Sequence, residues 1–297
     1  MIAPRADYTL SLAGRAPLVL GPRTLVMGVL NVTPDSFSDG GTGLDPVRAL
    51  DLALEMETAG ADILDIGAES TRPGATPLTG REERMRLLPV LRQLHRLGIP
   101  LSIDTTKAEV ARFGLDEGAS IINDISGLQY EPELGDIVAV RGAPLVLMHM
   151  RGRPSDMYAQ ATYGAVAADV TRELTRAIER AVSRGVRWEQ IVVDPGLGFA
   201  KRAEHSLASL AGLSALGALG RPVLAGPSRK SFLAAAGGSV ARDRDWATAA
   251  AVTTAVLAGA HIVRVHAVGE MVQVTRAADM IREHGTGSSE GSTRASS

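Results

Sequence analysis

Short apolar runs rich in β-branched residues recur along the chain, and each is followed by a polar or Gly-containing turn and a helical pattern. The eight runs are TLVMGVL (24–30), DILDIG (62–67), IPLSI (99–103), ASIIN (119–123), PLVLM (144–148), IVVDP (191–195), RPVLA (221–225) and HIVRV (261–265). Because nearly every position is apolar, they predict strands covered on both faces, as in a parallel sheet under helices. Their mean spacing of about 34 residues is that of the strand-plus-helix unit of an eight-fold barrel.

Helical patterns fill the segments between the runs. Residues 164–184 carry apolar side chains at four-residue steps, which predicts the most regular helix of the chain. Residues 45–58 begin with Asp45 as an N-cap, followed by a first-turn proline. Residues 81–96 form an amphipathic pattern in which Pro89 must kink or split the helix. Eight strand–helix units predict a closed (β/α)8 TIM barrel, and an open doubly wound sheet is the alternative.

The two ends of the chain fall outside this repeating pattern. The segment YTLSLAGRAPLVLG (8–21) predicts a short β-hairpin about Gly14, which can cover the barrel floor. After Glu283 the chain is rich in Ser and Gly without apolar periodicity, which predicts a disordered tail. The predicted organisation is an N-terminal hairpin over 1–23, a barrel over 24–283 and a tail over 284–297.

Composition and charge exclude several classes of protein. The 31 basic and 33 acidic residues give a net charge of −2, so we expect no nucleic-acid partner. The chain has no cysteine, which excludes disulfides, thiolate metal sites and a cysteine nucleophile.

The uncharged run 246–263 is interrupted by Gly259 and predicts a buried helix and a strand instead of a membrane span. Because Pro4 and Asp7 interrupt the apolar stretch that a secretory signal needs, we expect a cytoplasmic protein. Lysine is rare, with only three residues (107, 201 and 230) against 28 arginines.

A polar or charged group stands at the end of every predicted strand. These groups are Asn31, Asp65, Asp104, Asn123, His149, Asp194, the segment GPSRKSF (226–232), and Arg264 with His266. In a barrel of this kind the active site gathers at the carboxyl ends of the strands. One polar turn means little, but polar groups at all eight ends predict a site on that rim.

The carboxylates among them indicate the kind of ligand. A carboxylate accepts two parallel hydrogen bonds from an N–C–N donor edge, which a guanine or a pterin offers. Asp104 and Asp194 could accept from such an edge, and Asn123 with Lys230 could serve the remaining groups. The alternative is that the two carboxylates pair with arginines or helix N-termini for stability alone.

Donors suited to an anion are the second feature of the rim. They are Asn31, Thr71, Arg72, Arg264, His266 and the turn Ser228–Lys230. Loops after the seventh and eighth strands often bind phosphate, although Ser228 could instead simply cap the next helix. The amide oxygen of Asn31 fits Mg²⁺ whose other ligands come from a diphosphate.

The segments around the rim predict mobile loops and an aromatic substrate. Residues 31–43 and 71–80 are rich in Gly, Pro, Ser and Thr, as in lids that close over a reacting centre. Phe37 and Phe199 could contact a flat aromatic molecule there. His149 has no carboxylate or histidine at ligand spacing and is predicted to pack, while Arg151 is predicted to be solvated.

Together these motifs resemble the dihydropteroate synthase family. The motifs run in order from Leu25 to Val268: NVTPDSFSDGG (31–41), DIGAESTRPGA (65–75), SIDTTKAEVA (102–111), INDISG (122–127), MHMRGRP (148–154), DPGLGFAK (194–201), GPSRKSF (226–232) and RVHAV (264–268). The resemblance implies a transferase that joins 6-hydroxymethyl-7,8-dihydropterin diphosphate to p-aminobenzoate, giving 7,8-dihydropteroate and diphosphate in folate biosynthesis. It also implies Mg²⁺ as cofactor and a homodimer, for which the seventh and eighth helices are the expected contact surface.

The resemblance further implies a role for individual residues. The pterin would be held by Asp104, Asn123, Asp194 and Lys230. The diphosphate would be held by Thr71, Arg72, Arg264 and His266, with Mg²⁺ on Asn31. The p-aminobenzoate would lie against Phe37, Pro73, Phe199 and Ser228. The implied catalytic set is Asp104, Asp194, Lys230, Arg264 and His266.

Three alternatives share part of these features. A Schiff-base aldolase would use Lys230 as a nucleophile. A methyltetrahydrofolate-binding methyltransferase barrel would share the pterin-edge residues but would need no diphosphate donors. A pterin-binding homologue without activity would keep the motifs and lack turnover.

Overall fold

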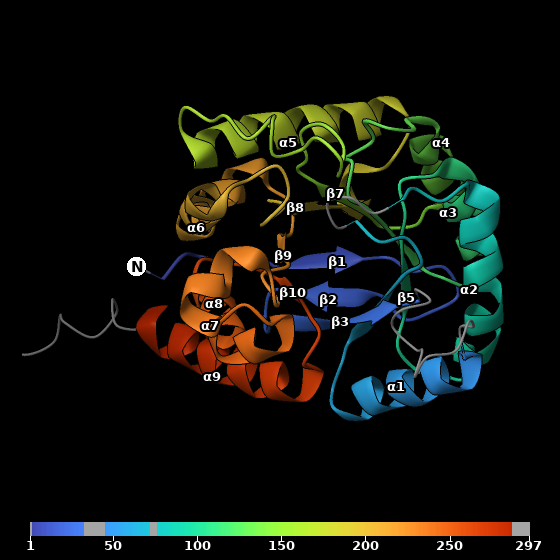
Figure 1. The fold of residues 1–297 in the computed structure, drawn as a ribbon, viewed down its shortest axis with the longest axis horizontal. Coiled ribbons are helices and arrows are strands. Elements are labelled where there is room, and N and C mark those ends of the chain that lie inside the picture. The colour runs from blue at the N-terminus through green and yellow to red at the C-terminus, as the bar shows by residue number, and fades with distance from the viewer. Residues whose placement is uncertain (1, 33–44, 72–75, 287–297) are drawn as a thin grey trace, which may run out of the picture.

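Eight parallel strands lie at the centre of the molecule and helices surround them, with α5 and α9 on opposite sides (Figure 1). The structure is a computed structural model that describes residues 2–32, 45–71 and 76–286. The strands are β3 (Leu25–Asn31), β4 (Ile63–Gly67), β5 (Leu101–Asp104), β6 (Ile121–Asp124), β7 (Leu145–Met148), β8 (Ile191–Asp194), β9 (Leu224–Ala225) and β10 (Ile262–Val265). Each coincides with one of the eight apolar runs, so all eight predicted strands are confirmed.

The sheet closes on itself. Its strand order is β8-β7-β6-β5-β4-β3-β10-β9, and each neighbouring pair is parallel. The two ends meet through a parallel bridge between Val193 and Val223, next to a 3.0 Å hydrogen bond from Val193 N to the Pro222 carbonyl. The (β/α)8 barrel is therefore confirmed, and the open doubly wound sheet is excluded.

Helices alternate with the strands, as the sequence predicts. They are α1 (Pro46–Thr58), α2 (Gly80–Leu94), α3 (Ala108–Asp116), α4 (Glu133–Arg141), α5 (Val166–Ser183), α6 (Ala203–Ala211), α7 (Ala234–Gly237), α8 (Asp245–Leu257) and α9 (Val268–Thr286). Short 3₁₀ helices are η2 (Trp188–Gln190), η3 (Leu213–Leu219), η4 (Ser231–Leu233) and η5 (Ala241–Arg244). Asp45 caps α1 by accepting from Val47 N at 2.9 Å. Pro89 lies inside α2 and does not split it.

The N-terminal hairpin forms the floor of the barrel. Strands β1 (Tyr8–Leu10) and β2 (Leu18–Leu20) pair antiparallel, and Gly14 between them has a φ of +67°, which a glycine adopts without strain. Leucines 10, 12 and 20 are buried against residues near the beginnings of the barrel strands, namely Leu25, Met27, Ile63, Ile121, Val146, Val192, Leu224 and Ile262. The predicted covering of the floor is confirmed.

Alternation along each strand separates the core from the site. Residues that face the helices, such as Leu64, Ile103 and Val193, belong to the large core between barrel and helices. Residues on the opposite face begin apolar at the hairpin end and become polar towards the carboxyl end. The polar residues on this inner face are Asp65, Asn123, Asp194 and Arg264. Each lies two positions after an apolar residue of the same strand and therefore points to the same face. The interior is thus apolar at the floor and polar at the rim.

The C-terminal part of the chain adds two details. The uncharged run forms α8, a turn with Gly259 at a φ of +97°, and β10, as predicted. Across the described ranges, no helix combines the length and apolar character that crossing a bilayer requires. The helix α9 continues to Thr286, beyond the barrel boundary predicted at 283, and the rest of the predicted tail lies outside the described residues.

Candidate active site

Arg264 on β10 joins two carboxylates across the barrel interior. Its Nε donates to Asp65 Oδ2 at 2.6 Å, and a terminal nitrogen donates to Asp104 Oδ2 at 2.9 Å. Asn123 Nδ2 also donates to Asp65 Oδ2, at 3.0 Å. Arg264 was predicted to face a diphosphate, and the structure shows it paired with the buried Asp65 and the partly buried Asp104. Asp65, which the sequence analysis placed at a strand end without a role, is central to this network.

Several buried polar atoms beside this network have no partner among the described residues. They are Asp65 Oδ1, Asn123 Oδ1 and Ser102 Oγ. They come from three adjacent strands, and Asp65 and Ser102 are register partners. Buried polar atoms are nearly always hydrogen-bonded, so two free acceptor oxygens and a hydroxyl indicate a place for a polar ligand.

Asp104 and Asp194 lie on the same inner face of the barrel. Burial raises the pKa of Asp104 to about 7, although the charge of Arg264 lowers it in part. Burial likewise raises the pKa of Asp194, against the opposing effect of the Lys230 ammonium. Asp194 Oδ1 accepts a 2.7 Å hydrogen bond from Gly196 N. The two carboxylates therefore share a water-poor interior in which a donor edge or a developing positive charge is favoured.

Lys230 is held between the loop after β8 and the turn after β9. Its Nζ donates to the Leu197 carbonyl and lies 4.3 Å from the centre of the Phe199 ring. The preceding Arg229 has a φ of +58° and is fixed by a two-point ion pair with Asp245, both contacts at 2.7 Å. Burial lowers the pKa of Lys230 to about 8, while Asp194 raises it in part.

Ser228 and His266 contact each other at the rim. Ser228 Oγ lies 2.9 Å from His266 Nδ1 and accepts from the His266 backbone N–H at 3.2 Å. Burial lowers the pKa of His266 to about 4, helped by the charge of Arg264, so the imidazole is neutral at neutral pH. The alternative that Ser228 caps the next helix is wrong, because the residue at the N-cap position of η4 is Lys230. Ser228 instead links the ends of two strands.

The remaining predicted site residues divide into two groups. Asn31 is exposed at the end of β3, in register with Gly67, which in turn pairs with Asp104. Thr71 is half-buried after β4. Both lie on the predicted rim. Three other residues lie outside the described part of the chain, namely Phe37, Arg72 and Pro73.

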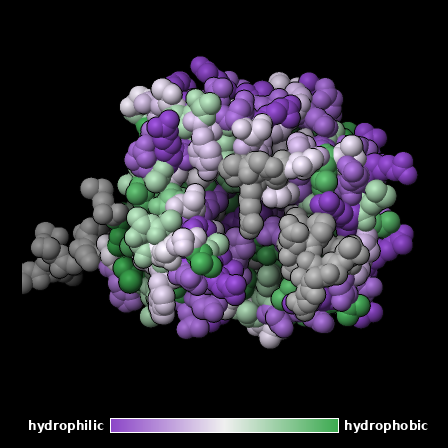
Figure 2. All heavy atoms as spheres, in the orientation of Figure 1, coloured by the Kyte–Doolittle hydropathy of each residue, from purple (hydrophilic) through white to green (hydrophobic). Residues whose placement is uncertain are grey.

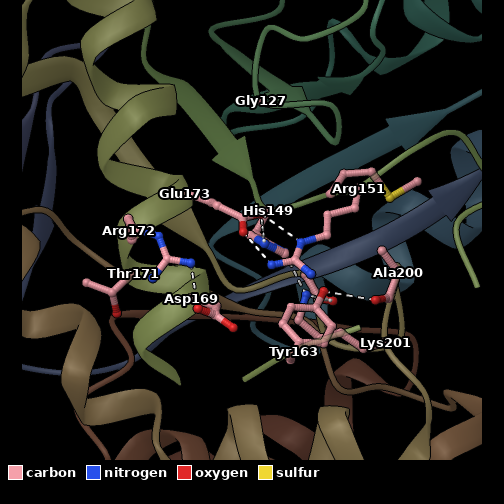
Figure 3. A network of polar contacts seen from close by, with 12 residues as sticks. Gly127, His149, Arg151, Tyr163, Asp169, Thr171, Arg172, Glu173, Ala200 and Lys201 are labelled. Carbon is pink, nitrogen blue, oxygen red and sulfur yellow. Dashed lines mark hydrogen bonds and ion pairs between the residues drawn. The ribbon is translucent and has the colours of Figure 1, made fainter. Parts of the chain in front are cut away.

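A second polar network lies beside the site, and sequence reasoning missed it (Figure 3). His149 is buried, as predicted, but its Nε2 lies 2.9 Å from Glu173 Oε2 and its Nδ1 lies 2.8 Å from Lys201 Nζ. The prediction that Arg151 is solvated is wrong. Its guanidinium donates to Glu173, and its Cζ lies 4.0 Å from the centre of the Tyr163 ring. The rarity of lysine could have drawn attention to Lys201.

Comparison with known proteins agrees with this geometry. The profile of the family described as pterin binding enzyme matches residues 27–266. The chain is also 45% identical over 267 residues to the dihydropteroate synthase of Synechocystis sp., an alignment that covers 88% of this chain and 91% of that protein. The chain belongs to the dihydropteroate synthase family of pterin-binding enzymes.

Solved structures of the family share the fold. The dihydropteroate synthase of Xanthomonas albilineans with 4-aminobenzoic acid superimposes with a TM-score of 0.86 at 40% identity, covering 93% of this chain and 99% of that one. The same enzyme in complex with 7,8-dihydropteroate gives a TM-score of 0.82 at 37% identity, covering 92% and 98%. This member of the dihydropteroate synthase family is a transferase of folate biosynthesis. The resemblance inferred from the motifs is confirmed, and the aldolase and methyltransferase alternatives are set aside.

Proposed function

We propose that the polar rim of this barrel condenses 6-hydroxymethyl-7,8-dihydropterin diphosphate with p-aminobenzoate, with the pterin ring inside the ring of strand ends. The observation that carries the proposal is a pair of buried acceptors, Asp65 Oδ1 and Asn123 Oδ1, that have no partner among the described residues and lie beside two further carboxylates. The amino-pyrimidinone edge of a pterin offers the N–H donors that such acceptors need.

Each pterin-facing residue has a defined part in this arrangement. The carboxylates of Asp104 and Asp194 and the amide oxygen of Asn123 accept from the ring edge, and Lys230 donates to a ring acceptor. Lys230 acts as a donor and not as a nucleophile, because the reaction needs no covalent intermediate with the protein. The ring of Phe199 lies beside the Lys230 ammonium, where an aromatic amine could stack.

Arg264 and His266 are suited to the diphosphate. If the Ser228 hydroxyl donates to Nδ1 of the neutral imidazole, Nε2 carries the proton and can donate to an anion. Arg264 retains N–H groups beyond the two that contact carboxylates. Together with Thr71 and Arg72, these donors can bind the leaving group.

The chemistry follows from these charges. Breaking the bond between the methylene carbon and the diphosphate leaves a cation delocalised into the pterin ring, which Asp104 and Asp194 stabilise. Arg264 and His266 stabilise the departing anion in the same water-poor interior. The amine of p-aminobenzoate then attacks the carbon and gives up one proton to the departing diphosphate. Its placement beside Phe199 and Ser228 holds it in reach.

We include Mg²⁺ in the proposal as an ion that would be held jointly by the protein and the diphosphate of the substrate. Asn31 offers one exposed amide oxygen at the rim, and the described ranges hold no cluster of three or more His, Asp or Glu side chains suited to a metal. Proteins often hold Mg²⁺ by one or two side-chain oxygens plus substrate phosphates, so the residues fit this kind of site. When bound, the ion would neutralise charge on the diphosphate.

Replacing Asn31 with alanine should therefore weaken Mg²⁺ use without harming the amine site. We expect the Mg²⁺ concentration for half-maximal turnover to rise by about tenfold, because one oxygen ligand is lost. The KM for p-aminobenzoate should stay unchanged. A titration of turnover with Mg²⁺ after chelation measures both quantities, and an unchanged Mg²⁺ requirement would remove Asn31 from the proposal.

The most direct test of the reaction is diphosphate release in a coupled assay. We expect release that depends on added p-aminobenzoate and is matched by formation of 7,8-dihydropteroate. Release at the same rate without the amine would instead indicate hydrolysis, and no release with either substrate would contradict the proposal.

Pterin affinity should depend on the protonation of Lys230. Its ammonium faces Asp194, Arg264 and Asp104, and burial lowers its pKa to about 8. As the pH rises through that value the proton is lost, so we expect the affinity for dihydropterin diphosphate to fall by about tenfold between pH 7 and pH 9. Calorimetry across this range measures the effect. The variant Lys230→Met should bind weakly with no such fall, and a fall that persists in it would assign the titration to another group.

We also propose a homodimer formed through α8 and α9, the helices that follow the seventh and eighth strands of the barrel. Trp246 is 90% exposed, and Met280 and Ile281 are 62% and 53% exposed. Hydrophobic residues gather along the edge of the molecule where these helices lie (Figure 2). Exposed apolar patches of this kind mark protein contacts.

The variant Trp246→Glu tests the dimer. We expect its molar mass by light scattering to be half that of the parent at micromolar concentration, because a charge in a buried interface is costly. Val140→Glu is the matched control, since Val140 is 85% exposed on α4, away from these helices. A parent protein that already has the mass of a single chain would overturn the dimer.

A further inference from the structure

Lys201 is an unusual residue because its charged side chain is fully buried. It is 2% exposed and follows directly on the loop Pro195–Ala200, which leaves the end of β8. Its Nζ contacts His149 Nδ1 at 2.8 Å, the Gly196 carbonyl at 3.1 Å and the Phe199 carbonyl at 3.2 Å. Burial lowers the pKa of Lys201 to about 7, and the charge of Asp194 raises it in part. The ammonium donates its three N–H groups to these three contacts, and the neutral amine can donate two and accept one from His149, so the contacts satisfy the nitrogen in either state.

The loop that Lys201 contacts has a strained backbone. Ala200 has a φ of +48°, in the left-handed region that residues with a Cβ rarely adopt, and Gly196 and Gly198 have φ values of +65° and +79°. A Cβ on Gly196 would lie 2.1 Å from the His149 carbonyl oxygen, so the loop lies directly against the end of β7. Such a conformation persists only where the surroundings hold it, and Lys201 bonds to it at two carbonyls.

The same loop fixes the groups that face the pterin. The Gly196 N–H donates to Asp194 Oδ1 at 2.7 Å, and the Leu197 carbonyl accepts from Lys230. The Phe199 ring lies 4.3 Å from the Lys230 ammonium. A shift of this loop would therefore displace Asp194, Lys230 and Phe199 together.

On its other side Lys201 is anchored through His149. Burial lowers the pKa of His149 to about 4, so at neutral pH the ring is neutral and its Nδ1 can accept from the ammonium. The remaining ring nitrogen faces Glu173, which also accepts from Arg151. Figure 3 shows His149 between Glu173 and Lys201, with Tyr163 beside them. Tyr163 adds a 2.9 Å hydrogen bond to the Ala200 carbonyl.

We propose that Lys201 is a positioning residue for the pterin site, tying the strained loop Pro195–Ala200 to β7 so that Asp194, Lys230 and Phe199 are aligned before substrate arrives. Among the described residues, the hydrogen bonds of Lys201 go to the loop and to His149, so it positions the site through other residues. Its charge also acts on Asp194 and Lys230. The inference rests on the proposed pterin-binding roles of Asp194 and Lys230.

The variant Lys201→Met removes the three donors and keeps the length of the side chain. We expect its Kd for dihydropterin diphosphate, measured by calorimetry in the folded protein, to rise by about tenfold because the binding groups are misaligned. The KM for the same substrate should rise by a similar factor. Lys201→Gln keeps an amide donor, so its Kd for dihydropterin diphosphate should rise by less. If Lys201→Met does not fold, the glutamine variant is used for the test instead.

Arg5→Met is the matched control for lost stability. The Arg5 side chain is also fully buried, and it bonds Asp279 at 2.9 Å and Thr24 at 2.7 Å near the hairpin end of the barrel. This variant should lower the melting temperature but leave the Kd for dihydropterin diphosphate unchanged. A rise in Kd confined to the Lys201 variants supports a positioning role that lost stability alone does not explain.

The outcome separates this inference from the proposed function. If folded Lys201 variants bind dihydropterin diphosphate with unchanged affinity while Asp194→Asn and Lys230→Met bind it weakly, the positioning role is overturned and the pterin site stands. If the Arg5 control loses as much affinity as Lys201→Met, the effect is one of stability and the inference is also overturned. If Asp194→Asn and Lys230→Met bind normally, the proposed pterin site itself is wrong.

Discussion

The variant Arg264→Met is expected to lose turnover and to unfold more easily, with a free energy of unfolding about 3–5 kcal/mol below that of the parent. Arg264 bonds Asp65 at 2.6 Å and Asp104 at 2.9 Å, and Asp65 is completely buried. Removing one partner of such a network leaves a buried charge without compensation. Urea unfolding followed by circular dichroism measures the loss, and the diphosphate assay measures turnover.

Two further variants make this test sharper. Adding Asp65→Asn to Arg264→Met should restore part of the stability, because the uncompensated charge is removed, but it should not restore turnover. Arg153→Met is the control, since Arg153 is exposed and stacks over Tyr130 at 4.4 Å, so we expect a change within about 0.5 kcal/mol. A loss of stability in Arg264→Met no larger than in this control would contradict the buried network.

Asp194→Asn is expected to weaken binding of dihydropterin diphosphate by about 10- to 100-fold, or roughly 1–3 kcal/mol. The carboxylate Oδ1 already accepts from Gly196 N at 2.7 Å. An asparagine that keeps this bond turns its NH₂ group towards the pterin, so a donor faces a donor edge. Calorimetry at neutral pH measures the affinity, with Asp51→Asn on the exposed face of α1 as a variant that should bind normally. Affinity like that of the parent would show that the pterin edge does not face Asp194.

Much of the fold could be predicted because its determinants are local. Each strand is a nearly continuous apolar run, and the segments 45–58, 81–96 and 164–184 show a helix cap or a helical periodicity, as at Asp45. The hairpin about Gly14 was also evident from a short stretch of sequence. Because the carboxyl ends of all the strands meet at one rim, the proximity of Asp104, Asn123 and Asp194 could be predicted without knowing any long-range contact.

The missed features depend on contacts between distant residues. Asp65 and Arg264 are 199 positions apart, and Ser228 and His266 are 38 apart, so no local spacing reveals either pair. The depth of Lys201 and its bond to His149, 52 positions away, are equally invisible in a linear pattern. Sequence reasoning identified which residue types reach the rim, but not which of them neutralise one another there.

The leucines of the hairpin fill one end of the barrel, with Leu10 and Leu20 at 1% and 0% exposure. Within the described part of the chain, a ligand would therefore reach the interior from the opposite end, where the strands terminate. A molecule bound close to that end would then have to leave before one bound beneath it could exchange with solvent.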